Sequence, residues 1–170
     1  NYEDPGCGSG DDSNACVVVI LVTDGVNSDT ITVSVSVTDS DEFDVSAPSD
    51  SDSDDNTLAE DVSNGASAEI TASASDADGS TNAVTYAITA QSCTGAFAID
   101  EDTGAVTVAD TGAIDYETAT SCTVTVTATS ADESTAETTF TVSITDVNDQ
   151  TPTYSSADTS PSVTEGTTAV

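Results

Sequence analysis

The sequence predicts an all-β protein with the architecture of a β-sandwich. Several segments alternate apolar and polar residues with a period of two, which is typical of half-buried strands. Turn-forming pairs separate these segments, among them Asp78-Gly79, Thr103-Gly104 and Thr111-Gly112. No window shows a convincing helical period of 3.6 residues. Many short strands at this spacing are typical of a sandwich.

The alternating segments are, in chain order, TITVSVSVT (30–38), AVTYAIT (83–89), AFAID (96–100), AVTVAD (105–110), CTVTVTATS (122–130) and TTFTVSITDV (138–147). In the last of these, Phe140, Val142 and Ile144 share one face, and we expect that face to be buried. CVVVILVT (16–23) is instead a continuous apolar run. Such a run predicts a strand that is covered on both faces.

The charge of the chain is entirely one-sided. The 170 residues include 32 Asp and Glu but no Lys, Arg or His, which gives a formal net charge of -32. Nucleic acids and anionic membrane surfaces are therefore excluded as partners, because nothing here neutralises phosphate. The fold repels itself, and no internal salt bridge relieves that repulsion. Bound cations, counterions or partner chains have to do so.

The composition also bears on location and class. The longest apolar run is shorter than the roughly 20 residues of a membrane span. The chain begins without Met and in mid-pattern, so we interpret it as a mature product or a window from a longer chain. Its richness in Ser and Thr is typical of extracellular β-rich or O-glycosylated chains. An enzyme is not expected, since no basic acid–base partners are present.

Four cysteines stand at positions 7, 16, 93 and 122. They form no CxxC pair, and an even number in a secreted-looking β chain favours disulfides. The sequence leaves the pairing open, and free thiols are the alternative. Our prediction pairs Cys7 with Cys16 across a Gly/Asp-rich loop, and Cys93 with Cys122 from one strand end to a strand start.

An internal repeat underlies the pattern. NYED (1–4) recurs as DYET (115–118), VSVSVTDSDEF (33–43) as TVSITDVNDQT (141–151), and LAED (58–61) as VTEG (163–166). All three offsets are a little over one hundred residues. The sequence therefore predicts the last strands of one repeat (1–45), a complete repeat (46–150), and a linker with the first strand of a third repeat (151–170).

The complete repeat carries LAED, SDADGSTN, IDYE and DVNDQTP in this order, and these motifs closely resemble the cadherin repeat. The resemblance implies a Greek-key, immunoglobulin-like sandwich, repeated in tandem as a rod whose joints bind Ca²⁺. It covers nearly all of 58–152 and, more loosely, both flanks. The ligand positions that it implies are Glu60, Asp76, Asp78, Asn82, Asp115, Glu117, Asp146, Asn148 and Asp149, with Glu3, Asp39 and Asp41 at the first boundary.

The chemistry of these residues agrees with the resemblance. Ca²⁺ takes six to eight oxygen ligands and needs neither His nor thiolate. Glu60, Asp115, Glu117 and the 146–149 cluster all flank strand ends, so we expect them to meet at one pole of the sandwich. Asp76, Asp78 and Asn82 are expected at the opposite pole, near Asp39 and Asp41. The alternative for each motif alone is a solvated acidic turn.

The sequence departs from the family pattern at the first boundary. The linker DSDEFDVSAP lacks the Asn-Asp pair, which leaves Asp41, Glu42 and Asp44 as alternative stand-ins. Ser130 stands where the family has an Asp after the strand, and Asp132 follows two positions later. The number of ions at this boundary is therefore open.

The sequence thus predicts a calcium-rigidified structural or adhesion module, extracellular or at the cell surface, within a long adhesin or fibre. Its partners would be neighbouring repeats or copies of itself, with O-glycans on segments such as TPTYSSADTSPS (151–162). The alternative is a carbohydrate-binding β-sandwich of a secreted protein. The shortage of aromatic residues argues against that alternative, since the chain has no Trp and only four Tyr.

Overall fold

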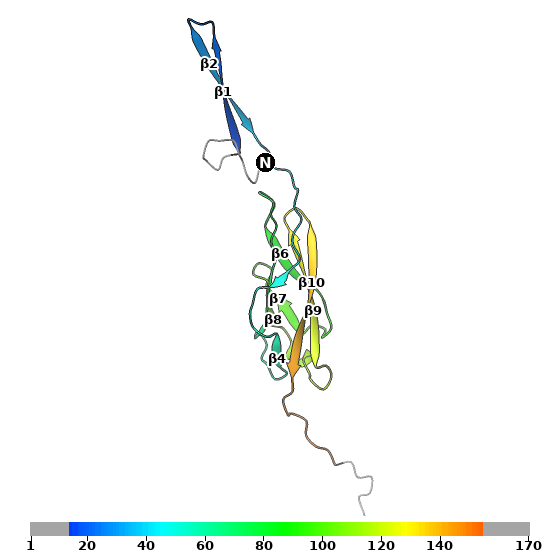
Figure 1. Ribbon diagram of the computed structural model, residues 1–170. Helices are drawn as coiled ribbons and strands as arrows, with labels where there is room; N and C mark the ends of the chain where they lie inside the picture. The colour runs from blue at the N-terminus through cyan, green and yellow to red at the C-terminus, as the bar shows by residue number, and fades with distance from the viewer. Residues whose placement is uncertain (1–13, 155–170) are drawn as a thin grey trace, which may run out of the picture.

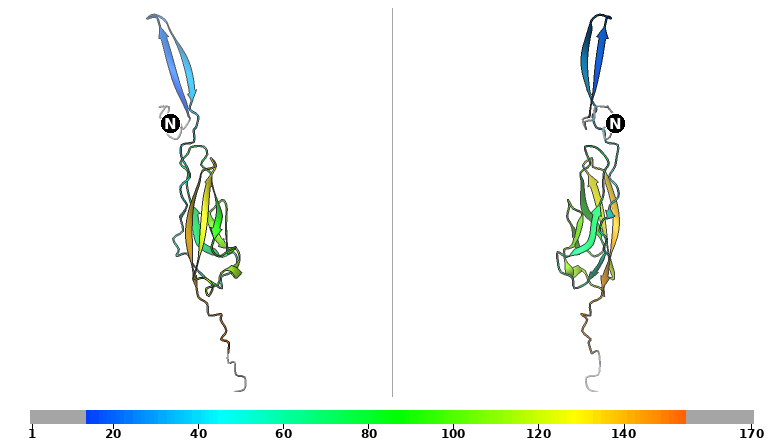
Figure 2. Two further views of the ribbon diagram at one scale, coloured as in Figure 1. Left: turned by 90° about the vertical axis from the view of Figure 1, so that its right-hand side faces the viewer. Right: turned by 60° about the vertical axis from the view of Figure 1, so that its left-hand side comes forward.

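A computed structural model describes residues 14–154 of the chain. This part is elongated, with a two-stranded hairpin at one end and a β-sandwich in the middle (Figures 1 and 2). It contains ten β-strands and a single 3₁₀ turn, η1 (Thr111–Ala113). Within it, no helix is long and apolar enough to cross a membrane. The predicted all-β class is confirmed.

The hairpin consists of β1 (Ala15–Thr23) and β2 (Ser28–Ser36), which pair antiparallel along their whole length. Its turn is closed by Asp24, whose carboxylate accepts hydrogen bonds from the amides of Val26 and Asn27. Residues 37–48 then lead from the hairpin into the sandwich (Figure 1).

Two four-stranded sheets form the sandwich. The strands of the first sheet, in spatial order, are β4 (Thr57–Ala59), β10 (Thr135–Thr145), β9 (Ser121–Ser130) and β6 (Val84–Gln91). The strands of the second are β3 (Ser49–Asp50), β5 (Ser67–Ser73), β8 (Ala105–Val108) and β7 (Phe97–Ile99). The links β3–β4, β4–β5, β5–β6, β6–β7 and β8–β9 cross between the sheets, and β4 runs parallel to β10.

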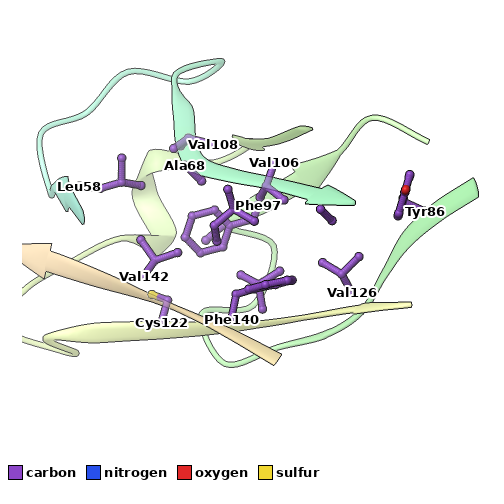
Figure 3. Close-up of a cluster of buried hydrophobic side chains, with 14 of the residues drawn as sticks. Leu58, Ala68, Tyr86, Phe97, Val106, Val108, Cys122, Val126, Phe140 and Val142 are labelled. Carbon is purple, nitrogen blue, oxygen red and sulfur yellow. The ribbon is translucent and has the colours of Figure 1, made fainter. Parts of the chain in front are cut away.

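Alternating residues of the two sheets meet in one hydrophobic core (Figure 3). Phe97 of one sheet and Phe140 of the other lie in its middle, between fully buried valines such as Val106, Val126 and Val142. The period-two pattern assigned Phe140, Val142 and Ile144 to one buried face, and all three are buried. The strands predicted at 83–89, 96–100, 105–110, 122–130 and 138–147 are confirmed within a few residues at each end.

The period-two pattern did not predict β5. Its inward residues are Ala68, Ile70 and Ala72, all buried, so two small alanines carry most of the alternation. The strand is also irregular, because its pairing with β8 shifts register between Ser67 and Thr71. Glu69 takes a positive φ of 56° in that interval, as expected of a bulge. Weak contrast and a bulge together hide the period.

The prediction for the apolar run 16–23 is half wrong. It forms a strand, but that strand is exposed on both faces, with Val17 to Val22 between 46% and 66% exposed. Within the described residues the β1–β2 sheet has no second sheet against it. The continuous apolar run therefore predicted the strand correctly, but the burial of its two faces was predicted wrongly.

One predicted disulfide is confirmed, between Cys93 beyond the end of β6 and Cys122 at the start of β9. The bond closes a loop with a sequence separation of 29, which in the chain-entropy account stabilises the fold by about 3.5 kcal/mol. Cys16 is not a free thiol. Its predicted partner, Cys7, lies outside the described residues.

The sandwich has two poles that the strands hold far apart. β10 spans 11 residues, about 35 Å at the usual rise per residue, with Asp132 before its start and Asp146 after its end. The linker 37–48 reaches the sandwich at the proximal pole, beside the β9–β10 turn, and the chain leaves β10 at the distal pole (Figure 1). Acidic residues gather at both poles.

Candidate metal sites at the two poles of the sandwich

The distal pole brings together three carboxylates from widely separated parts of the chain. Glu60 follows β4, Glu117 follows η1, and Asp149 follows β10. One carboxylate oxygen of each lies within 4.8 Å of the other two. We call these three residues the distal cluster. The sequence predicted that they would converge at one pole, and the structure brings them together.

Glu60 is the centre of the distal cluster. Its side chain is only 9% exposed. One carboxylate oxygen accepts the amide of Tyr116 at 2.7 Å, and the other accepts the amide of Val147 at 2.7 Å. Glu60 therefore ties the η1 loop and the β10 exit to the end of β4, which holds Glu117 and Asp149 near it.

Neighbouring carboxylates repel the negative charge of Glu117. Its own backbone amide lowers its pKa, but partial desolvation and the charges of Glu60, Asp149 and Asp146 outweigh that effect and raise it. Asp146 is thus close enough to act on the distal cluster electrostatically. A divalent cation bound between these groups would remove the repulsion.

The remaining distal predictions are placed differently. Asp115 caps a turn, since its two carboxylate oxygens accept the amide and the hydroxyl of Thr118, and these hydrogen bonds lower its pKa. Asn148 is exposed, and no contact given for the described residues joins it to the cluster. Gln150, which stands in place of the family's last Asn, donates to Asp149 at 3.0 Å.

The proximal pole joins the linker to the sandwich through carboxylates. Asp39 and Glu42 of the linker each offer an oxygen within 4.8 Å of Asp78. Asp78 is only 1% exposed, and it accepts the amide of Glu42 at 3.2 Å. Asp39 accepts a hydrogen bond from the hydroxyl of Ser80. Although burial raises the pKa of Asp78, the amides of Ser80 and Glu42 hold it below its ordinary value.

Three more carboxylates complete this pole: Asp41, Asp76 and Asp132. Partial desolvation first, and then the nearby charge of Asp132, raise the pKa of Asp41; the charges of Asp78 and Asp76 add to the effect. One oxygen of Asp76 accepts a hydrogen bond from the amide of Asp78, and the other is buried and has no hydrogen-bond partner among residues 14–154. We call Asp39, Asp41, Glu42, Asp76, Asp78 and Asp132 the proximal cluster.

The other residues named for this boundary are less involved. Asn82 is exposed, and none of the contacts given for residues 14–154 links its side chain to the proximal cluster. Asp44, one of the three stand-ins, is exposed and absent from the acidic groups found there, whereas Glu42 belongs to one. Glu3 lies outside the described residues.

The sequence profile of the cadherin domain matches residues 54–145. The chain belongs to the cadherin domain family. The matched segment runs from just before β4 to the last residue of β10, and so covers both sheets except β3. The cadherin fold indicates an extracellular, adhesion-type module, and the cadherin domain family is a family of non-enzymatic adhesion modules.

Solved cadherin structures agree with this assignment. Extracellular cadherin domains 1–5 of protocadherin gamma B2 align with 80% of this chain at 30% identity and a TM-score of 0.60. Mouse clustered protocadherin PcdhgC3 EC1–3 aligns with 78% of the chain at 21% identity and a TM-score of 0.62. Protocadherin gammaB7 EC3–6 aligns with 80% of the chain at 24% identity and a TM-score of 0.60. At these identities the two structures show the fold alone. The chain spans 26%, 44% and 33% of the three matched fragments, respectively. A comparison with curated protein sequences finds no match.

The family implies calcium, and the residues at both poles suit it. Every ligand atom on offer is an oxygen, which is the donor that Ca²⁺ prefers. One oxygen each of Asp39, Asp76 and Asp132 is buried and accepts no hydrogen bond within the described part of the chain. Buried carboxylate oxygens without donors are costly unless a cation binds them, and the sequence contains no side-chain cation.

A hollow of the sandwich outside the two clusters supports no sugar site. It has a volume of about 450 Å³ beside β4 and β10, and its lining is Asp54, Asp55, Asn56, Thr57, Thr141 and Ser143. This lining offers no aromatic ring on which a sugar could stack. The carbohydrate-binding alternative therefore gains nothing from the structure.

Proposed function

We propose that this chain is a calcium-rigidified segment of an extracellular adhesive rod, part of a long surface adhesin or fibre. One observation carries the proposal. Acidic clusters stand at both poles of the cadherin domain, and each combines residues of the sandwich with residues of the chain that enters or leaves it. Such clusters lie where consecutive repeats would meet.

Electrostatics supplies the mechanism. Two unit charges 4 Å apart repel by about 1 kcal/mol in water and by about 4 kcal/mol at the effective dielectric constant of a protein surface. Without a cation, repulsion between linker and sandwich carboxylates loosens the joint. With Ca²⁺ bound, the same carboxylates are shared ligands, which fixes the angle of the linker and stabilises the native arrangement that assembles the site.

The β1–β2 hairpin supports a preceding repeat within residues 1–45. It pairs Cys16 with Val35 as the β9–β10 hairpin pairs Cys122 with Val142. The same register aligns Val18 and Ile20, 48% and 46% exposed, with Val124 and Val126, both 0% exposed. We therefore infer that further strands of a preceding repeat cover this face of the hairpin, as β5 and β8 cover β9.

The structural comparisons support a tandem arrangement. The cadherin profile covers residues 54–145, which is 92 of 170 residues or 54%, whereas the gamma B2 fragment aligns with 80% of the chain. The alignment with this multidomain fragment therefore reaches beyond the single complete domain. The gammaB7 fragment is described as a cis-dimer. For this chain we propose neighbouring repeats, or copies of itself, as partners, with O-glycans on the Ser/Thr-rich linker.

Calorimetric titration with Ca²⁺ tests the proposal. The wild-type chain should bind more than one Ca²⁺ per molecule. The double variant Glu117→Gln/Asp149→Asn should lose the distal share, because it removes two of three clustered carboxylates. The control Glu101→Gln/Asp102→Asn removes two exposed charges that belong to neither cluster and should bind as the wild type does. An unchanged isotherm for the cluster variant would refute the distal site, and a wild-type chain without binding would refute the function.

A further inference from the structure

The β1–β2 and β9–β10 hairpins differ at their turns. Thr23 pairs with Ser28 in the first hairpin, as Thr129 pairs with Thr135 in the second. Four residues, 24–27, connect the first pair, whereas five residues, 130–134, connect the second. The register therefore places Ser130 at the position of Asp24 and makes the second turn one residue longer.

Ser130 is committed to a structural contact. Its side chain is only 4% exposed, and its hydroxyl donates to the carbonyl of Thr81 at 2.8 Å. It therefore holds the loop before β6 against the end of β9. The acidic residue of this turn is Asp132, two positions later, with Glu133 at a φ of 75° completing the longer loop.

Asp132 is held in a fixed position. One of its carboxylate oxygens accepts the amide of Ser134 at 2.7 Å. The hydroxyl of Ser134 in turn accepts the amide of Val45, a buried linker residue, at 2.9 Å. This pair of hydrogen bonds fixes the Asp132 turn relative to the linker that carries Asp39, Asp41 and Glu42.

The other carboxylate oxygen of Asp132 is buried and has no hydrogen-bond partner within the described residues, as is true of one oxygen each of Asp39 and Asp76. The charge of Asp132 is among the causes that raise the pKa of Asp41, so the two carboxylates lie close enough to repel each other. Asp78, 1% exposed, is buried in the same cluster. These carboxylates converge in a chain that has no Lys, Arg or His to neutralise them.

We propose that Asp132 is a direct ligand of a hard divalent cation, Ca²⁺, in the proximal cluster. Ser130 has no carboxylate to offer, and the longer β9–β10 turn places the carboxylate of Asp132 at the site instead. The proposal rests on the proposed function, since it requires calcium at this pole. It adds a ligand that motif spacing does not identify. It also assigns a cation at the boundary where the sequence left the number of ions open.

The test follows Ca²⁺ titrations by backbone amide NMR in the wild type, in Asp132→Asn and in the control Glu133→Gln. The amides of Ser134 and Val45 report on the proximal pole, and those of Tyr116 and Val147 on the distal pole. Asp132→Asn should weaken the proximal response at least about 10-fold, since even outer-shell changes cost 10- to 100-fold. The distal response should stay unchanged, and Glu133→Gln should titrate as the wild type.

Thermal melting without calcium separates a ligand from a structural residue. In EGTA, Asp132→Asn should melt no lower than the wild type, because Asn keeps an oxygen for Ser134 and removes one repelling charge. With calcium it should melt lower. A proximal response equal to that of the wild type, or a lower melting temperature already in EGTA, overturns the proposal. If Ca²⁺ shifts only the distal amides of the wild-type protein, the proposal is also overturned. If Ca²⁺ shifts the amides of neither pole, the proposed function is overturned as well.

Discussion

Saturating Ca²⁺ should raise the melting temperature of this chain by at least about 10 °C. A ligand that binds only the native state at 100 times its dissociation constant adds about 2.7 kcal/mol. For a domain of 60–100 residues, 1 kcal/mol corresponds to about 4–8 °C. One occupied site therefore accounts for about 10–20 °C, and the structure offers a cluster at each pole. Differential scanning calorimetry in EGTA and in millimolar CaCl₂ measures the shift.

Screening has to be distinguished from binding in that experiment. A chain with a formal charge of -32 is stabilised by any salt, because counterions reduce its self-repulsion. NaCl at matched ionic strength is therefore the control, and it should reproduce only a small part of the shift. Equal melting temperatures in matched NaCl and CaCl₂ would show that no specific calcium site forms.

Replacing Glu60 by Gln should produce the largest single-residue effect. Both carboxylate oxygens of Glu60 accept backbone amides, from Tyr116 and Val147, in a buried setting. Gln offers one oxygen, and its amide nitrogen would face the other N–H. Losing one charge-assisted bond costs about 1.5–3 kcal/mol, with a further cost for the unpaired buried amide. We expect a loss of about 2–4 kcal/mol in EGTA.

The same substitution should also weaken calcium binding at the distal pole, so the stabilisation by calcium becomes smaller. Urea unfolding with and without Ca²⁺ gives both quantities for one variant. Glu137→Gln is the matched control, because Glu137 lies exposed on β10 and belongs to neither cluster, and it should leave both values within about 0.5 kcal/mol. A Glu60→Gln variant as stable and as calcium-responsive as the wild type would contradict the role assigned to Glu60.

Much of the fold could be predicted from the sequence because the alternation is strong where burial is complete. Val124, Val126 and Val142 are fully buried and sit at the alternate positions of their strands. The pattern failed in β5, where alanine gives little contrast. It also failed for β1, because an apolar run favours burial of a strand but does not show which residues bury it.

The acidic sites could be predicted in part. Strand ends placed Glu60, Glu117 and Asp149 together, and repeat spacing placed Asp78 near Asp39. The sequence could not show that the Asp115 carboxylate would bond Thr118, since a local hydrogen bond competes with a distant cation. Nor could it show which acids of the longer linker and turn face inward. The sequence offered Glu42 as one of three alternatives and Asp132 as an acid two positions after Ser130, and the backbone hydrogen bonds of the structure show how the two residues are held.

The central claim is that acidic oxygens at the poles of the sandwich bind divalent cations. X-ray diffraction from crystals grown in CaCl₂, with the anomalous signal of calcium measured, tests it most directly. The account predicts anomalous peaks bounded by Glu60, Glu117 and Asp149 at one pole and by Asp39, Asp78 and Asp132 at the other, with oxygen distances of about 2.3–2.6 Å. Millimolar calcium in the crystal with no anomalous peak at either cluster would contradict it.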